Sequence, residues 1–295
     1  MSLEWIQFIN TTLVPVGLML IMFSLGLTLA LHDFGLVARR PLLVGLGLGT
    51  HLFILPVLGL AIGALFMLPP EMALGLFIIS LCPAGTTSNA LTFVGKGNVA
   101  LAVVLTALTS LVTVFTIPLL LSWAVPWFLE RQGVAVPQLS VTNVIFQLLR
   151  ITVVPIVVGM LVKHFLPAFA AKLARWLRPT AFVILIVVIA CSVIVSVDLV
   201  LDNLIRATPA IVALNLTAMT VGLGIGRIMG ANARDSMTLA IETGVQNVTL
   251  AIFLTLTVLD SLPLAVTQNI YGVVMLANAS LLILWWRPRI AAEAP

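Results

Sequence analysis

Apolar residues run along the chain in nine long segments that short polar connections separate. The segments cover residues 9–31, 41–67, 71–94, 98–124, 140–163, 177–198, 206–228, 236–259 and 262–286. Each has about the length of 17–25 residues that a helix needs to cross a bilayer. The pattern therefore predicts an all-α integral membrane protein with nine transmembrane helices.

Two of these segments are interrupted near their middle by polar and helix-breaking residues. In the third segment, Pro83 and Gly85 precede four consecutive hydrogen-bonding side chains at 86–89. In the eighth, Glu242 is followed by Gly244 and an amide pair at 246–247. An ionisable side chain at that depth is costly, which points to a partner, a cavity or an ion path. Paired broken helices are typical of secondary transporters, whose sites lie where the breaks meet.

The positions of the two interruptions indicate an internal symmetry. The third and eighth segments lie an odd number of spans apart, so they cross the membrane in opposite directions. We expect an inverted-topology repeat of four plus five helices within one membrane transport domain over residues 1–295. Repeat one covers about 9–124 and repeat two about 140–286. Polar ends of both broken helices would then meet at mid-membrane, where carbonyls suit a cation and N–H groups an anion.

Composition excludes several other classes of protein. Hydrophobic residues make up 61% of the chain and charged residues only 8%, with a mean hydropathy of +1.24, which excludes a soluble domain. The net charge of +4 comes from bases in short connections, so nucleic-acid binding is excluded. Cys82 and Cys191 lack metal-ligand spacing. Since no HExxH motif, intramembrane Ser/Lys pair or Asp/Asp pair is present, we expect no enzyme. A channel is disfavoured because no charged ring is evident.

The basic residues also predict an orientation. With the N-terminus outside and the C-terminus cytoplasmic, 11 of the 14 Lys and Arg residues lie on the inner side. These are Arg39, Arg40, Lys96, Lys163, Lys172, Arg175, Arg178, Arg227, Arg234, Arg287 and Arg289. The positive-inside rule therefore predicts a multi-pass protein of the inner (plasma) membrane in this orientation.

Four stretches together resemble the bile acid:sodium symporter family, in particular bacterial members with nine spans. They are residues 21–29 with Asp33 and Phe34, then 82–89, 97–101 and 242–247. The resemblance extends over most of the chain. It implies a core domain with two crossing helices, a panel domain, and sodium-coupled symport of an organic anion by alternating access.

The resemblance also implies the residues of two sodium sites, so that one or two Na⁺ ions would be the coupling ions. The first site would be formed by Ser88, Asn89, Thr106 and Glu242. The second would combine Glu242, the carbonyls of Thr243 and Val245, Gln246, and the side chain at position 51. One fixed negative charge among neutral oxygens suits a monovalent cation better than calcium.

Two residues depart from the family's pattern at these sites. Ala102 stands where the family usually has a serine, and His51 stands where it usually has a glutamine. Imidazole is a poorer sodium ligand than an amide oxygen and titrates near neutrality. Taken alone, His51 is more simply a hydrogen-bonding partner between helices. The departures therefore leave open an alternative, a proton-coupled or sodium-independent organic-anion transporter of the same fold.

The sequence defines the substrate-binding residues less closely than the sodium ligands. The resemblance implies that the anion binds beside the crossing, at Thr86 and Asn247, and polar residues in later spans add Asn215 and Asn278 as candidates. The family's histidine–asparagine pair is not evident at 274–276. Both a bile acid and a small carboxylate such as pantoate or pyruvate therefore stay open. The expected partners are this substrate and the lipid bilayer, with no obligate protein partner.

Other polar and small residues in the spans have simpler interpretations. Five threonines are expected to bond to their own helices, namely Thr109, Thr113, Thr116, Thr217 and Thr220. Pro56, Pro118 and Pro155 are expected to kink theirs. The glycines at 222, 224, 226 and 230 have spacings that permit tight packing either between copies or within the monomer.

Overall fold

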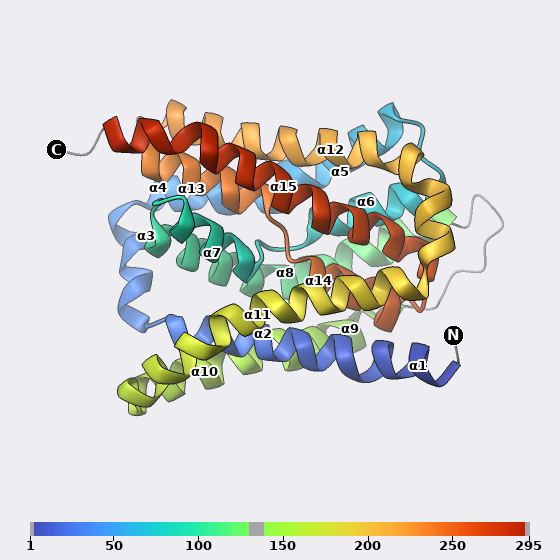
Figure 1. Cartoon of the computed structure of the whole chain (residues 1–295), viewed down its shortest axis with the longest axis horizontal. Helices are drawn as coiled ribbons and strands as arrows, with labels where there is room; N and C mark the ends of the chain where they lie inside the picture. The colour runs from blue at the N-terminus through green and yellow to red at the C-terminus, as the bar shows by residue number, and fades with distance from the viewer. Residues whose placement is uncertain (1–2, 130–138, 293–295) are drawn as a thin grey trace.

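The computed structural model describes residues 3–129 and 139–292, which form a bundle of helices running mostly along one axis (Figure 1). In its first part the elements are α1 (Leu3–Phe8), the π-helical turn η1 (Ile9–Leu13), α2 (Val14–Thr28), the short 3-10 helix η2 (Leu31–Phe34), α3 (Gly35–Arg39), α4 (Pro41–Gly49), the π-helical turn η3 (Thr50–Ile54), α5 (Leu55–Leu65), α6 (Pro70–Leu81), α7 (Thr86–Val94) and α8 (Val99–Leu129).

The second part is also helical throughout its named elements. Its elements are α9 (Val141–Leu148), the π-helical turn η5 (Leu149–Val153), α10 (Val154–Phe165), α11 (Pro167–Val195), α12 (Val197–Ile228), α13 (Ala233–Gly244), α14 (Val248–Ile252), the π-helical turn η6 (Phe253–Val258) and α15 (Leu262–Ala292). The prediction of an all-α membrane protein is confirmed at this level.

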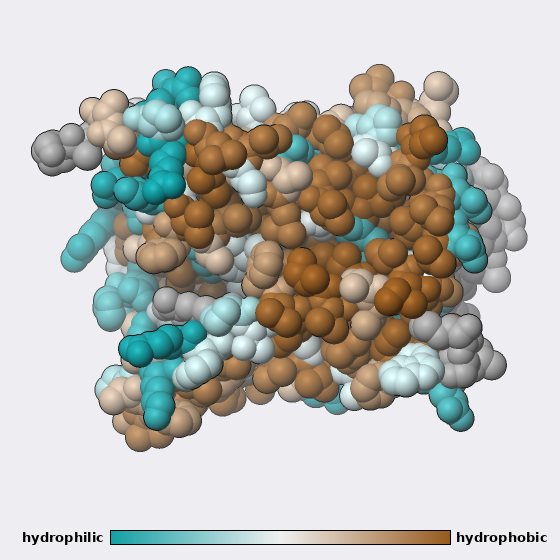
Figure 2. Space-filling model, viewed as in Figure 1, coloured by the Kyte–Doolittle hydropathy of each residue, from teal (hydrophilic) through white to brown (hydrophobic). Residues whose placement is uncertain are grey.

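Seven continuous helical segments in the described ranges are long and apolar enough to cross a bilayer. They are Glu4–Thr28, Pro41–Leu65, Val99–Leu129, Val141–Phe165, Pro167–Val195, Val197–Ile228 and Leu262–Ala292. Two apolar helices, Pro70–Leu81 and Val248–Val258, are shorter, and they belong to the two segments in which the sequence predicts breaks. Figure 2 shows that apolar residues cover the middle of the visible face of the bundle, with polar residues gathered toward both ends.

The boundary between the sixth and seventh predicted spans differs from the structure. The sequence predicts spans at 177–198 and 206–228, whereas α11 and α12 are joined at Ser196 alone. Residues 167–176 and 199–205 are helical although they carry charges. Polar side chains at the ends of a helix end its apolar stretch without ending its hydrogen bonds, so hydropathy underestimates helix length there.

Three π-helical turns lead into a helix whose second residue is proline. Pro15 follows η1, Pro56 follows η3 and Pro155 follows η5. Proline has no N–H and its ring collides with the carbonyl four residues earlier, so the preceding turn widens. The expected distortions at Pro56 and Pro155 are therefore present, whereas α8 continues through Pro118 as one α-helix.

The connection between the fourth and fifth predicted spans, residues 125–139, is described only in part. The long helix α8 continues to Leu129, and residues 130–138 lie outside the described ranges. The rings of Trp123 and Trp127 stack with centroids 5.6 Å apart, and Phe128 meets Trp127 edge-on at 4.7 Å. These aromatic residues lie near the end of the bundle, where aromatic belts form at membrane surfaces.

Glycines bring two pairs of helices into backbone contact. On α2 and α10, a Cβ at Gly26 would lie 2.2 Å from the carbonyl oxygen of Ile156, and one at Gly159 would lie 2.6 Å from that of Phe23. Only glycine permits this approach, which is the usual use of small residues between membrane helices. Helices α2, α10 and α11 pack on one another at the lower side of Figure 1.

Helices α12 and α13 approach in the same way. A Cβ at Gly222 would lie 2.4 Å from the carbonyl oxygen of Leu239, and one at Gly226 would lie 2.7 Å from the Cα of Ser236. A Cβ at Gly224 would meet nothing within 4 Å, and Gly230 has a φ of +63°, a backbone conformation that favours glycine. Gly222 and Gly226 therefore serve packing within the monomer, where they hold the helix that carries Glu242.

Candidate functional site

The two predicted breaks lie against each other at the centre of the fold. The chain between α6 and α7 and the chain between α13 and α14 form one antiparallel bridge, Ala84 with Gln246. The N–H of Gly85 donates to the carbonyl of Val245 at 3.0 Å, and the N–H of Asn247 donates to that of Pro83 at 2.8 Å. The extended residues at one break thus supply hydrogen-bonding partners to those at the other.

Local sequence explains why the helices end here. Pro83 lacks the N–H that would continue α6, and Cys82 before it takes the extended conformation that a following proline favours, with ψ at 148°. A Cβ at Gly85 would lie 3.0 Å from the carbonyl oxygen of Gln246, so the close crossing favours glycine at this position. On the other segment, the Asn247 side chain accepts from Leu250 N–H at 3.0 Å and begins α14.

Four of the predicted site residues meet beside this crossing. Glu242 is buried with 1% of its surface exposed. Its Oε1 atom is hydrogen-bonded to Ser88, and its Oε2 atom accepts from the Thr106 hydroxyl at 2.8 Å. The same Thr106 hydroxyl lies 3.4 Å from Asn89 Oδ1. Residues from α7, α8 and α13 therefore contact one another around a single carboxylate.

Each of the two hydroxyl groups in this cluster faces two oxygen acceptors but has one proton to donate. Ser88 Oγ lies within hydrogen-bonding distance of both Glu242 and the Gly85 carbonyl, the latter at 2.7 Å, but its hydroxyl has one proton. Thr106 likewise stands between Glu242 and Asn89. A carboxylate surrounded by neutral oxygens fits a hard monovalent cation such as sodium. Within the described residues no group of three His, Cys, Asp or Glu side chains could hold a metal ion.

The residues predicted for a second site lie around the end of α13 that carries Glu242. His51 is 2% exposed and lies against the main chain of Cys82 and Glu242, yet neither ring nitrogen has a partner at hydrogen-bonding geometry. Gln246 Nε2 donates to the Thr243 carbonyl at 2.7 Å, and its Oε1 atom is buried without a partner. The Val245 carbonyl already accepts from Gly85. Unpaired buried polar atoms are costly, so the Gln246 oxygen and one acceptor nitrogen of a neutral His51 ring are available to a ligand here.

Ala102 is fully buried on α8, one turn before Thr106. A methyl group therefore occupies the position at which a serine hydroxyl would add another oxygen to this part of the core. The cluster around Glu242 keeps the hydroxyls of Ser88 and Thr106 only.

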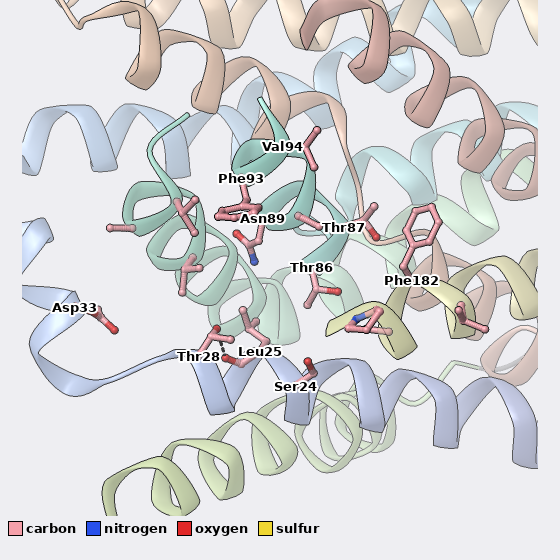
Figure 3. A pocket seen from close by; sticks show the side chains of 17 residues that line it. Ser24, Leu25, Thr28, Asp33, Thr86, Thr87, Asn89, Phe93, Val94 and Phe182 are labelled. Carbon is pink, nitrogen blue, oxygen red and sulfur yellow. Dashed lines mark hydrogen bonds between the residues drawn. The ribbon is translucent and has the colours of Figure 1, made fainter. Parts of the chain in front are cut away.

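A cavity of about 650 Å³ opens beside the crossing, between the start of α7, α2, α8 and α11. Figure 3 shows Thr86, Thr87 and Asn89 on its α7 side, Ser24 and Thr28 opposite on α2, and Phe182 on α11. Its lining residues are Ser24, Leu25, Thr28, Asp33, Thr86, Thr87, Asn89, Ala90, Phe93, Val94, Val99, Ala100, Val103, Pro179, Ala181, Phe182 and Val183. A mostly apolar cavity of this size with a few polar groups suits a small organic ligand.

The four predicted substrate residues occupy different positions relative to this cavity. Thr86 lines it, whereas Asn247 is 4% exposed and caps α14, with its Nδ2 atom unpartnered. Asn215 donates to the Gly244 carbonyl at 2.7 Å, and Asn278 donates to Asn215 at 2.9 Å. Neither Asn215 nor Asn278 is among the lining residues; both support the end of α13.

Several polar residues in this region were missed by sequence reasoning. Tyr271 donates to the same Gly244 carbonyl at 2.9 Å, and a lone tyrosine within an apolar span was the available signal. Ser24, Thr28 and Asp33 line the cavity, and their place in the recognised stretch at 21–34 was the signal for them. Gln268 and Asn269 on α15 are buried and carry unpartnered atoms.

Membrane-length helices together with two broken helices that meet at a buried carboxylate define a polytopic membrane transporter. Comparison with known proteins agrees, because the profile of the Sodium Bile acid symporter family matches residues 15–203. The chain therefore belongs to the Sodium Bile acid symporter family, a family of transporters and not of enzymes.

Individual relatives cover most of the chain. It is 31% identical to the probable sodium/metabolite cotransporter BASS2, chloroplastic, of Oryza sativa subsp. japonica, over 96% of this chain and 66% of that protein, which is just under two thirds of its length. It is 29% identical to the uncharacterized sodium-dependent transporter YocS of Bacillus subtilis, over 94% and 84% of the two chains. Identity to the human ileal sodium/bile acid cotransporter is 25%, over 82% and 68%.

Proposed function

We propose that the chain is a secondary active transporter that uses sodium to drive symport of an organic anion. The observation that carries this proposal is the Glu242 carboxylate, buried among Ser88, Thr106 and Asn89 at the crossing of two broken helices. Relatives described as sodium/metabolite and sodium/bile acid cotransporters support sodium as the coupling ion.

The proposal assigns two groups of sodium ligands. The first consists of Ser88, Asn89, Thr106 and Glu242; the second consists of Glu242, Thr243, Val245, Gln246 and His51. Support is stronger for the first group, because its side chains already contact one another. In the second group, only the Gln246 oxygen and the His51 nitrogens are unpartnered.

Alternating access would require two bodies that move against each other. We propose nine spans, namely the seven continuous helical segments and the two interrupted ones at Pro70–Val94 and Ala233–Val258. They would form a four-plus-five inverted repeat, with repeats at about 9–124 and 140–286. The packing of α2, α10 and α11 on one another is consistent with a separate panel, and the antiparallel bridge between the breaks is consistent with the repeat.

We propose the cavity on α7 as the substrate site. Thr86 and Thr87 stand at the first turn of α7, whose N–H groups and dipole favour an anionic group. Leu25, Phe93 and Phe182 would contact the apolar part of the ligand. The volume of about 650 Å³ accommodates either a small carboxylate such as pantoate or part of a bile acid. The protein would lie in the plasma membrane with its N-terminus outside and its C-terminus in the cytoplasm.

Uptake into proteoliposomes tests this function. Labelled pantoate, pyruvate and a bile acid are offered to vesicles with an inward sodium gradient and to matched vesicles in choline. We expect saturable, concentrative uptake of at least one anion in sodium and none in choline. Uptake that persists in choline and follows an imposed pH gradient would instead support the proton-coupled alternative, which the unpartnered His51 nitrogens favour.

Filling the cavity is expected to separate substrate binding from sodium binding. Ala90 is exposed to the cavity on α7, so Ala90→Trp places a large ring between the α7 and α11 walls. We expect uptake to fall at least about tenfold, which corresponds to about 1.4 kcal/mol of lost binding. Sodium-dependent thermal stabilisation of the purified protein should stay unchanged.

The matched control is Ala61→Trp, at an exposed position of α5 that does not line the cavity. It should transport like the unsubstituted protein. Normal uptake in Ala90→Trp would argue that the substrate binds elsewhere.

A further inference from the structure

The helix that carries Glu242 has a second buried carboxylate at its opposite end. Asp235, in the first turn of α13, has only 1% of its surface exposed. Its Oδ1 atom accepts from Asn98 Nδ2 at 2.7 Å, and its Oδ2 atom pairs with the guanidinium of Arg40. A buried carboxylate with two such partners is held firmly in one place.

Asp235 lies on the face of α13 that also carries Glu242. Asp235, Thr238 and Glu242 are spaced by three and four residues, so they follow one another along one side of the helix. Thr238 Oγ1 accepts from the Asn98 N–H at 2.8 Å. All three side chains on this face therefore contact α7, α8 or the turn between them.

The turn between α7 and α8 fits closely onto this face. A Cβ at Gly97 would lie 2.7 Å from Thr238 Oγ1, so only glycine allows the approach. Asn98 contacts α13 through its N–H and its side-chain amide, and its Oδ1 atom accepts from Leu101 N–H at 3.1 Å at the start of α8. One residue thus connects the start of α8 to two successive turns of α13.

These contacts join three helices that carry candidate cation ligands to the residue that precedes α4. Ser88 is on α7, Thr106 on α8 and Glu242 on α13, while Arg40 directly precedes α4, which leads to His51. Glu242 lies seven residues beyond Asp235, about 10 Å along the helix. The breaks join α7 and α13 at one end of the Glu242 cluster, and Asp235 joins them at the other.

We propose that Asp235 is a positioning residue for the Glu242 cation site, acting through Arg40 and Asn98 to hold α13 in register with α7 and α8. This inference rests on the proposed sodium-coupled function. Asp235 itself contacts none of the candidate ligands and would not bind the ion. Its loss would let α13 shift by a fraction of an ångström. A shift of that size is enough to lengthen the distances between the ligand oxygens and the cation and so to weaken binding.

Sodium titration of thermal stability in detergent tests the proposal. A positioning role predicts that Asp235→Asn raises the sodium concentration for half-maximal stabilisation about three- to thirtyfold. At saturating sodium the full stabilisation should return, because the ligands are intact. The double variant Asp235→Asn with Asn98→Asp exchanges carboxylate and amide across the same hydrogen bond but leaves Arg40 without its carboxylate partner, so it should restore part of the lost affinity.

Trp286→Phe is the matched control. It removes the indole donor that bonds the Ala233 carbonyl at 3.0 Å, in the same first turn of α13 but from α15. It should lower the melting temperature in choline without moving the sodium midpoint. If Asp235→Asn behaves in the same way, with lower stability and an unchanged midpoint, Asp235 is structural only and the proposal is overturned.

Two further outcomes keep the inference distinct from the function on which it rests. If the unsubstituted protein shows no sodium response, sodium coupling is overturned and the positioning role with it. If Asp235→Asn does not fold, Arg40→Gln gives the same test, because the Arg40 side chain is half exposed and its loss creates no cavity. An unchanged sodium midpoint in Arg40→Gln would then overturn the proposal.

Discussion

Sodium-dependent stabilisation and sodium-driven uptake are both expected to disappear when Glu242 is replaced by glutamine. The substitution keeps the shape of the side chain and its contacts with Ser88 and Thr106, but removes the single carboxylate charge of the cluster. At about 4 Å and an effective dielectric constant of about 20, one ion pair contributes about 4 kcal/mol. That is about a thousandfold in sodium affinity, enough to abolish binding at millimolar sodium.

Glu71→Gln is the control for this experiment. It makes the same chemical change in the first turn of α6, at a partly exposed position away from the crossing. We expect it to keep the sodium shift in melting temperature between sodium chloride and choline chloride. A normal sodium response in Glu242→Gln would show that the coupling cation binds elsewhere.

The core of the site was predictable from the sequence because its residues are out of place in an apolar segment. Glu242 and the polar run after Pro83 contrast with the surrounding aliphatic residues, and the cost of burying them requires partners. In the structure Ser88 and Thr106 form hydrogen bonds with Glu242, which agrees with the grouping that the family resemblance implies.

The other end of α13 carried no such signal. Arg40 and Asp235 lie in short connections between apolar segments, and Asn98 is the first residue of one such segment, where polar side chains are ordinarily solvated. Their pairing joins residues separated by 137 and 195 positions in the chain, a relation that hydropathy does not encode. Only the fold shows that Asp235 is buried.

Buried amides show a second limit of sequence reasoning. The sequence predicts Asn215 and Asn278 as substrate candidates because polar side chains inside a membrane span are costly and often mark a binding site. In the structure Asn278 donates to Asn215, and Asn215 donates to the Gly244 carbonyl. This carbonyl has no partner within the helix because α13 ends there. A break in a helix creates backbone groups that also need partners, and residue type alone does not distinguish that role from ligand binding.

Helix α12 fixes the position of Glu242 through contacts at two places on α13, its end at the break and its middle. Asn215 bonds the end of α13, while Gly222 and Gly226, farther along α12, allow backbone contact with its body. Since α13 is fixed from this side, any side chain added to the contact must displace the helix that carries the carboxylate. Packing on α12 and cation binding on α13 are therefore coupled.

Gly222→Leu is accordingly expected to be among the most damaging single substitutions in the chain. Its Cβ alone would lie 2.2 Å from Thr243 Oγ1 and 2.4 Å from the Leu239 carbonyl oxygen, and main-chain atoms cannot rotate away. Overpacking of this kind costs about 1–3 kcal/mol or more, so we expect the melting temperature to fall by roughly 5–10 °C and the sodium response to weaken. Gly224→Leu, two residues along on the same helix, meets nothing within 4 Å and should melt at or above the original temperature, since leucine favours helix over glycine. Equal melting temperatures for the two variants would show that α13 tolerates displacement, and would contradict the coupling between this contact and Glu242.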